Sequence, residues 1–306
     1  MRIISFGSLN IDRVYKVEHF VQPGETISSK GYLSNVGGKG LNQSVAAAKA
    51  GIQVIHGGAV GEDGAALTDY LTAAGVDASR VAVLPGVSGH AIIQVDAQGR
   101  NCIIVSGGTN MQLSEDYIDS VLTRNSEKGD IVLLQNETSN VSYIIRRAHE
   151  CGMRVAFNPS PIPDAPGELP LEYVDYLILN EIEGACLAEI SDRECDFRQV
   201  LSVLSERFPS AVIVLTMGAA GSLCKKGETI YEQGIFKVEA VDTTAAGDTF
   251  CGYFLAGVCR NLTLPDCLKN AAAASSLAIS KAGAAQSIPN HREVEEFLRQ
   301  NDAKGA

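Results

Sequence analysis

TTAAGDTFCG, residues 243 to 252, is a turn of small residues that runs directly into an apolar helical segment. Helix starts of this kind commonly collect phosphates, because free backbone N–H groups and the positive end of the helix dipole face outward there. The amides of Ala245, Ala246 and Gly247 are unobstructed and form a candidate anion hole. The next residue, Asp248, places an acid where anionic ligands are expected.

Asp248 has two interpretations. A carboxylate beside an anion hole repels a resting anion, but it can accept a proton from a hydroxyl that attacks that anion. Phosphoryl transfer needs this pairing, because its loose transition state is stabilised mainly by positioning and by charge opposite the equatorial oxygens. The alternative is an acid that caps a helix start, which is a common role. This motif alone leaves both interpretations open.

A second glycine-rich motif, NVGGKGLNQSVAAAKAG, occupies residues 35 to 51. Gly37 and Gly38 permit close backbone approach to a ligand, and Lys39 and Asn42 bring a cation and an amide to the mouth of the following helix. Such groups suit sugar hydroxyls. The segment is not a Walker A loop, because a glycine follows the lysine and a leucine replaces the first glycine. A glycine-rich turn without a ligand is the bland alternative.

Short apolar runs alternate with helical patterns along most of the chain, which is typical of βαβ units and a parallel sheet. The predicted buried strands are residues 2–7, 53–60, 130–135, 154–159, 176–180 and 211–216. The predicted helices are residues 41–51, 64–75, 114–125, 142–152, 196–208, 246–259, 264–283 and 292–300.

Two regions break this pattern. Residues 13–36 and 88–106 read as alternating strands, the second with a hairpin turn from Asp96 to Gly99. Half-buried antiparallel strands of this kind predict a small sheet that projects from the main one. Such an appendage often acts as a lid over a site.

Composition excludes several classes of protein. The 306 residues carry a formal charge of −11 with no long basic run, which argues against nucleic acid and anionic membranes as partners. The apolar stretch at the start of the chain is too short for a signal peptide, and no later run of apolar residues is long enough to span a membrane. The eight cysteines never form CxxC. Free thiols in the cytoplasm are therefore expected.

The two motifs, in this order and at this spacing, resemble the signatures of the ribokinase-like (PfkB-type) carbohydrate kinases. The resemblance covers nearly the whole chain and includes GSLNID at 7–12, LLQNET at 133–138, FNPSP at 157–161, NEIE at 180–183 and LTMGAAGS at 215–222. It implies a single domain over 1–306 with a three-layer α/β/α fold, a mostly parallel central sheet and a lid sheet from about 13–36 and 88–106.

The resemblance also implies a role for each matching residue. Asp248 is the expected catalytic base, next to the anion hole of Ala245, Ala246 and Gly247. The sugar is expected to contact a polar set made of carboxylates, amides, a glycine and a lysine: Asn10, Asp12, Gly38, Lys39, Asn42, Glu137 and Asp248.

Nucleotide and metal sites follow from the same resemblance. ATP is expected beside Thr216, Gly218, Gly221 and Asn270, with Asn180 and Glu183 near Mg²⁺ and the phosphates. Magnesium takes few direct protein ligands, although an exposed Asn-x-x-Glu is by itself usually a solvated helix start. A monovalent cation such as K⁺ is expected at a site of mostly carbonyl groups: Asp242, Thr244, Ala278, Lys281, Gly283 and Ser287.

The expected reaction is ATP-dependent phosphorylation of the primary hydroxyl of a pentose, with D-ribose giving D-ribose 5-phosphate. Deoxyribose, another sugar or a nucleoside are alternative acceptors, and a non-catalytic sugar-binding regulator is an alternative from another class. A homodimer through the lid sheet is expected. Arg13 either reaches an anionic substituent of the substrate or is an ordinary surface arginine.

Overall fold

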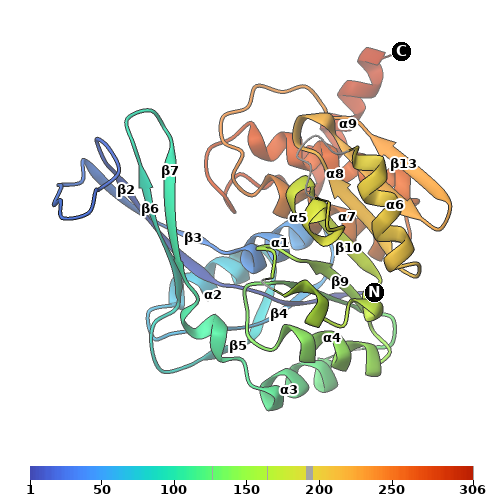
Figure 1. The fold of residues 1–306 in the computed structure, drawn as a ribbon, viewed down its shortest axis with the longest axis horizontal. Helices are drawn as coiled ribbons and strands as arrows, with labels where there is room; N and C mark the ends of the chain where they lie inside the picture. The colour runs from blue at the N-terminus through green and yellow to red at the C-terminus, as the bar shows by residue number, and fades with distance from the viewer. Residues whose placement is uncertain (126, 164, 191–195, 306) are drawn as a thin grey trace.

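Nine strands form the central sheet in the order β13-β12-β11-β10-β9-β8-β1-β4-β5 (Figure 1). The computed structural model describes residues 1–125, 127–163, 165–190 and 196–305. Every neighbouring pair from β11 to β5 is parallel, while β12 and β13 are antiparallel. The strands are β1 Ile3–Phe6, β4 Val54–Val60, β5 Asp77–Val83, β8 Ile131–Gln135, β9 Arg154–Asn158, β10 Tyr176–Asn180, β11 Val212–Thr216, β12 Ser222–Lys226 and β13 Thr229–Gln233.

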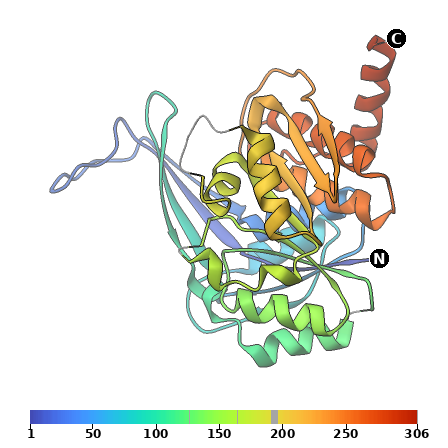
Figure 2. The same ribbon diagram turned by 45° about the vertical axis from the view of Figure 1, so that its right-hand side comes forward.

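Helices cover both faces of this sheet, so the central strands are apolar on both sides (Figure 2). Successive residues alternate between faces: Ile3 joins one buried cluster and Ile4 the other. The first cluster includes α1 Lys39–Lys49, α2 Ala65–Ala73, α7 Ala246–Cys259, α8 Leu264–Ile279 and α9 His291–Gly305. The second includes α3 Glu115–Asn125, α4 Val141–Glu150, α5 Glu181–Leu187 and α6 Phe197–Arg207.

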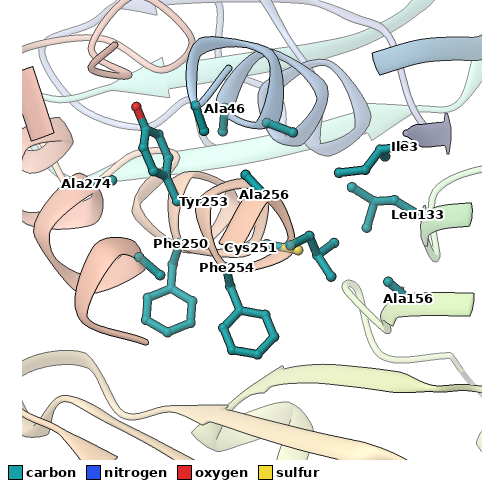
Figure 3. Packing of buried hydrophobic residues seen from close by; sticks show 14 of the residues in the cluster. Ile3, Ala46, Leu133, Ala156, Phe250, Cys251, Tyr253, Phe254, Ala256 and Ala274 are labelled. Carbon is teal, nitrogen blue, oxygen red and sulfur yellow. The ribbon is translucent and has the colours of Figure 1, made fainter. Parts of the chain in front are cut away.

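Helix α7 is the centre of the first cluster. All of its residues from Thr249 to Cys259 are buried, which explains why this segment is apolar all round. Figure 3 shows Phe250, Tyr253 and Phe254 on α7 among small side chains of the neighbouring helices, including Ala46. Small residues at these positions let α1, α7 and α8 approach closely.

A separate four-stranded sheet, in the order β3-β2-β6-β7, projects from the main body (Figure 1). Short 3₁₀ turns complete the chain. The small-sheet strands are β2 Asn10–Lys16, β3 Gly31–Gly37, β6 Gly89–Val95 and β7 Asn101–Ser106, and the 3₁₀ turns are η1 Gly108–Gln112, η2 Pro166–Glu168, η3 Leu171–Tyr173 and η4 Gly218–Ala220.

The expected fold class is confirmed: a mostly parallel sheet between helical layers, with a small second sheet. The hairpin turn also lies where it was predicted, since Gly99 N–H donates to the Asp96 carbonyl at 3.0 Å. Strands β5, β12 and β13 were not predicted. Strands β5 and β13 form the two edges of the sheet and are only partly buried, and β12 is short and ends in two lysines, so none of them has a long apolar run.

Two further expectations concern the whole chain. Seven cysteines within the described ranges are free thiols, and Cys195 lies outside those ranges. No helix in the described part of the chain combines the length and apolarity needed to cross a bilayer.

A buried histidine ties α1 to the central sheet. His56 on β4 is fully buried, its Nδ1 lies 2.8 Å from the Ser44 hydroxyl, and its Nε2 lies 3.2 Å from the Gly7 carbonyl. Burial lowers the pKa of His56 to about 4, against a partial opposing effect of the Gly7 carbonyl. The folded protein therefore keeps this ring neutral.

We expect acid to destabilise the fold through His56. The unfolded chain binds a proton at this residue below about pH 6.5, whereas the folded chain does so only near pH 4, so stability is lost as pH falls through this window. At pH 5 the loss is about 2 kcal/mol relative to neutral pH. Urea unfolding of the wild type and His56→Gln at pH 7 and pH 5 measures it. Equal acid losses in both proteins would contradict the assignment.

Candidate active site

Asp248 lies in the first turn of α7, and two side chains of α1 hold its carboxylate. Oδ2 accepts a hydrogen bond from Asn42 Nδ2 at 2.9 Å, and Oδ1 accepts one from Gln43 Nε2 at 2.9 Å. The residue before α7, Ala245, has φ 60°, a left-handed conformation that favours glycine. The hydrogen bonds from Asn42 and Gln43 come from α1, so the Asp248 carboxylate is oriented by a neighbouring helix and does not cap its own.

The backbone at the start of α7 supplies free donors. The first N–H groups of a helix have no partner within it. Ala246 N–H makes a long hydrogen bond of 3.3 Å to the Thr243 carbonyl, so this amide of the expected anion hole is partly used. Ala246 and Gly247 line two adjacent cavities, which places the start of α7 between them.

Lys39 is the cation of this region. Burial acts to lower its pKa, but the charges of Asp248, Glu137 and Glu183 raise it above the usual value. The ammonium group therefore stays charged and offsets part of the repulsion among three carboxylates. It also lines the same polar cavity as Asp248.

Glu137, just beyond the end of β8, lies on the other side of Lys39. Its carboxylate accepts hydrogen bonds from the Ser8 hydroxyl and from Lys39 N–H, the latter at 3.4 Å. Burial raises the pKa of Glu137, and nearby Asp248 adds to this, while Ser8 and Lys39 act in the opposite direction. The carboxylate is thus held in place by neighbours that favour its charged form.

Asp12 and Asn10 lie on β2, where the small sheet meets the main body. Burial, followed by the negative charge of Glu137, raises the pKa of Asp12 to about 6. The carboxylate packs against Gly37 on β3 so closely that a Cβ there would collide with it. Asn10 is buried, and its Oδ1 accepts a hydrogen bond of 2.8 Å from Asn110 Nδ2.

Gly38 and Asn42 complete the expected sugar set. Gly38 has φ 99°, and a Cβ there would press on the Ser8 carbonyl, so only glycine fits this turn into α1. Asn42 is buried, and its Oδ1 has no hydrogen-bond partner in the part of the chain that the structure describes. A buried acceptor next to Asp248 is a ready partner for a ligand hydroxyl.

Two adjacent cavities occupy the carboxyl ends of the strands. The first is polar and is lined by Lys39, Asp248 and the ends of β9 and β10. The second, of about 670 Å³, is mostly apolar and is large enough for a drug-sized ligand. Thr216, Thr243, Ala246 and Gly247 line both.

The structure brings most of the expected nucleotide residues to the second cavity. Thr216, Gly218 and Gly221 line it, and the two glycines have φ of 51° and 93°. Asn270 does not line it: its Nδ2 donates to the Asp266 carbonyl of its own helix at 2.8 Å. Ala272, two positions further along α8, takes that place.

Asn180 and Glu183 form a capping box at the start of α5. Asn180 Oδ1 accepts from the N–H groups of Ile182 and Glu183, and Glu183 Oε2 accepts from Asn180 N–H at 3.0 Å. Both residues nevertheless line the polar cavity. One oxygen of Glu183 serves the helix, and a carboxylate has a second oxygen to offer.

Asp242 joins the loop before α7 to the loop after α8. Its carboxylate accepts hydrogen bonds from Thr244 N–H, from the Thr244 hydroxyl and from Gly283 N–H, at 2.6–3.0 Å. The Ala278 carbonyl accepts from Lys281 N–H, and buried Ser287 donates to the Ala284 carbonyl. Five of the six residues of the expected cation site thus fall on these two neighbouring loops, and Ala278 lies in the last turn of α8.

Arg13 lies near Asp63 and is not among the residues that line either cavity. Burial acts to raise the pKa of Asp63, but hydrogen bonds from Ser88 and the charge of Arg13 hold it below its usual value. The surface interpretation of Arg13 is therefore the one that the geometry favours.

Four residues that support this site were not predicted: Ser8, Gln43, Asn110 and Asn158. Ser8 holds Glu137, Asn110 holds Asn10, and Asn158 accepts a hydrogen bond from Gln43 at 2.9 Å. Each acts on a residue far away in the sequence, so local patterns carry no trace of the contact. The one available signal is polarity at positions flanked by apolar or small residues.

Comparison with known proteins adds independent evidence. The profile of the pfkB family of carbohydrate kinases matches residues 1–291. The ribokinase of Haemophilus influenzae is 34% identical over 304 residues, covering 95% of this chain and 96% of the relative.

Two solved structures share the fold. The ribokinase of Arabidopsis thaliana complexed with ribose and ATP superposes with a TM-score of 0.85 at 29% identity, covering 97% of this chain and 98% of that one. The ribokinase of Cryptococcus neoformans var. grubii in complex with ADP gives 0.82 at 32% identity, covering 96% and 98%.

Proposed function

Since the chain belongs to the pfkB family of carbohydrate kinases, we infer that it is an ATP-dependent sugar kinase whose acceptor is D-ribose. It transfers the terminal phosphoryl group of ATP to the primary hydroxyl of the sugar, and the products are D-ribose 5-phosphate and ADP. The single observation that carries the mechanism is the Asp248 carboxylate, fixed at the start of α7 between a polar and an apolar cavity.

The residues divide the work by their chemistry. Asp12, Glu137 and the free Oδ1 of Asn42 are acceptors for sugar hydroxyls, while Lys39 is a charged donor. Asp248 accepts the proton of the attacking hydroxyl as general base. The N–H groups at the start of α7 face the phosphoryl oxygens, on which negative charge is spread during transfer. Water exclusion in the cleft strengthens each of these interactions.

ATP takes the second cavity, in this proposal, with its base among apolar side chains. Phe236, Ala272 and Ile279 line the cavity, and the adjoining turn lines it with small residues only, Gly218, Ala219 and Gly221. The cavity reaches Ala246 and Gly247, so the phosphates extend toward the start of α7. This direction brings the terminal phosphate to the polar cavity that holds Asp248.

A magnesium ion fits the Glu183 region. No group of three His, Cys, Asp or Glu side chains suited to a metal occurs in the described ranges, but Mg²⁺ usually keeps several waters and takes one or two carboxylates together with phosphates. Glu183 lines the polar cavity and Asn180 lies beside it. When bound, the ion neutralises phosphate charge; Glu183 and Asn180 orient its waters.

A monovalent cation fits the two loops joined by Asp242. Asp242, Thr244 and Gly283 already form one hydrogen-bonded unit, and the Ala278 carbonyl, in the last turn of α8, accepts from Lys281 N–H. This unit immediately precedes the start of α7. A bound K⁺ would therefore stabilise the backbone that presents the Ala246 and Gly247 amides. We propose that the protein works in the reducing cytoplasm, a location that its free thiols and its ATP substrate support.

The protein is, in our proposal, a homodimer joined through the small sheet. Strand β7 is exposed along its whole length, although it carries the apolar run Ile103, Ile104 and Val105. Tyr32 and Leu33 on β3 are about half exposed as well. Exposed apolar side chains of this kind mark a candidate interaction site, and a second copy of the same sheet offers the same side chains.

Replacing Asp248 with Asn tests the role of the base. We expect kcat to fall by about a thousand-fold with ribose binding nearly unchanged, because the amide keeps the shape but cannot accept the proton. A coupled ADP-release assay with ribose, deoxyribose, other sugars and nucleosides measures turnover in both proteins. Near-normal turnover in the variant would reject the assignment, and a wild type most active on another acceptor would reject ribose.

The pH profile of ribose use reports on Asp12. We expect kcat/KM for ribose to fall as pH drops below about 6, because the protonated Asp12 carboxyl loses acceptor capacity for a sugar hydroxyl. Steady-state kinetics from pH 5 to pH 8 measure this. In Asp12→Asn the acid fall near pH 6 should disappear from an already low kcat/KM. An unchanged profile in that variant would assign the titration to another group.

Ile104→Lys tests the dimer. We expect light scattering after gel filtration to show the mass shift from dimer to monomer, because a buried lysine at the interface would be desolvated. Val83→Lys is the matched control, since Val83 is an apolar residue about as exposed as Ile104 but lies on β5, outside the small sheet. A wild-type monomer, or a variant that stays dimeric, would contradict the proposal.

A further inference from the structure

Gln43 is a fully buried amide at the centre of the site. It lies on α1, one position after Asn42, and no part of its side chain is exposed. Its Nε2 donates to Asp248 Oδ1 and to Asn158 Oδ1, each at 2.9 Å. Its Oε1 accepts from Gln135 Nε2 at 2.7 Å and lies 3.5 Å from the Cys251 thiol, a weak donor. These contacts use both N–H groups and both lone pairs of the amide.

Full use of these groups leaves one orientation for the amide. If the amide were flipped, Gln43 Oε1 would face the Asp248 and Asn158 oxygens, and its Nε2 would face the Gln135 donor. Each pair would then be repulsive in a site that excludes water. Gln43 can therefore act on Asp248 only as a donor.

The amide is anchored in turn by the ends of three neighbouring strands. Gln135 is the last residue of β8, and Asn158, its register partner, is the last residue of β9. Asn158 Nδ2 donates to the carbonyl of Ile178 on β10 at 2.9 Å, which fixes its Oδ1 toward Gln43. The central sheet thus sets the position of Gln43, and Gln43 sets one oxygen of Asp248.

We propose that Gln43 is a positioning residue for the general base, so that the carboxyl ends of β8 and β9 orient the Asp248 carboxylate through this one amide. The proposal rests on the proposed function of Asp248. Gln43 holds Oδ1 and Asn42 holds Oδ2, so two uncharged donors fix the plane of the carboxylate. Each oxygen keeps a lone pair for the proton of the attacking hydroxyl.

Orientation of this kind affects turnover more than binding. A general base works only when its lone pair is within hydrogen-bond reach of the proton that it accepts, and small misplacements lower rates steeply. Gln43 is fully buried, and the proposed ligand acceptors Asp12 and Glu137 are held by other neighbours. Loss of the Gln43 amide should therefore lower kcat and leave KM for ribose and ATP almost unchanged.

The main experiment compares Gln43→Met with Ser44→Ala. Methionine keeps the length of the side chain and removes its hydrogen bonds. We expect kcat to fall about 10- to 100-fold, with KM for both substrates within about 3-fold. Ser44 is the next residue of α1, is equally buried and loses a buried bond to His56, but it does not contact Asp248. Its variant should lose thermal stability and keep kcat within about 2-fold.

Combination with Asp248→Asn separates positioning from general loss of structure. If Gln43 acts through Asp248, adding Gln43→Met to Asp248→Asn should change the residual kcat by less than about 2-fold, although it costs about 10-fold or more in the wild-type background. Fully multiplicative effects would overturn the proposal. So would a normal kcat in Gln43→Met, or an increase in KM as large as the fall in kcat.

A second variant covers the case in which methionine prevents folding. Gln43→Glu has nearly the same shape, and its carboxyl can donate to Asp248 only when protonated. We expect its kcat, relative to the wild type at each pH, to rise as pH falls from 8 to 6. A ratio independent of pH would count against positioning. Activity of the wild type on ribose is measured in parallel, so failure of the proposed function is seen separately.

Discussion

The close crossing of α1 and α7 is the constraint on which this site depends. At Gly252 a Cβ would collide with Ala46 and with the backbone of Gln43, so the two helices approach as closely as glycine allows. This approach brings Asn42 and Gln43 within 2.9 Å of Asp248. The buried alanines around α7 extend the same close packing toward α8 (Figure 3). The glycine that ends the motif at 243–252 thus sets the distance at which its aspartate is held.

The charges of the site are arranged around Lys39. Three carboxylates in a partly buried cleft would repel one another: Asp248, Glu137 and Glu183. The nearby ammonium group of Lys39 offsets part of this repulsion and so favours the charged form of each carboxylate. The backbone at the start of α7 contributes amide donors, and Asp248 in its first turn contributes a negative charge. An arriving phosphate therefore meets the Lys39 ammonium group and several N–H groups, while the carboxylate beside it remains available for a proton. This answers why an acid occupies a place suited to anions.

The sequence indicated the residues proposed for the chemistry of the site, but not the residues that hold them in place. Asp248 and Lys39 were predicted from the glycine-rich motifs and Glu137 from the family resemblance, and the structure brings all three together. Gln43 could not be predicted, because its partners are the last residues of β8 and β9, whose alignment depends on sheet register. Asn270 illustrates a different limit: it lies two positions from Ala272, and two positions turn a side chain by about 200° around a helix. The edge strands β5 and β13 were missed because their burial is incomplete, and β12 was missed because it is short and ends in two lysines.

The small sheet is fixed to the main body at Asn10, one of the residues proposed to bind the sugar. Asn110 makes three hydrogen bonds at its base, to Leu9 N–H, to the Leu9 carbonyl and to Asn10 Oδ1. A Cβ at Gly89 would collide with both amides, so β6 leaves the main body through the same tight contact. The far end, by contrast, exposes β7 along its length. Asn10 is therefore tied to the main body, and we expect it to keep its position if the outer strands of the small sheet are displaced.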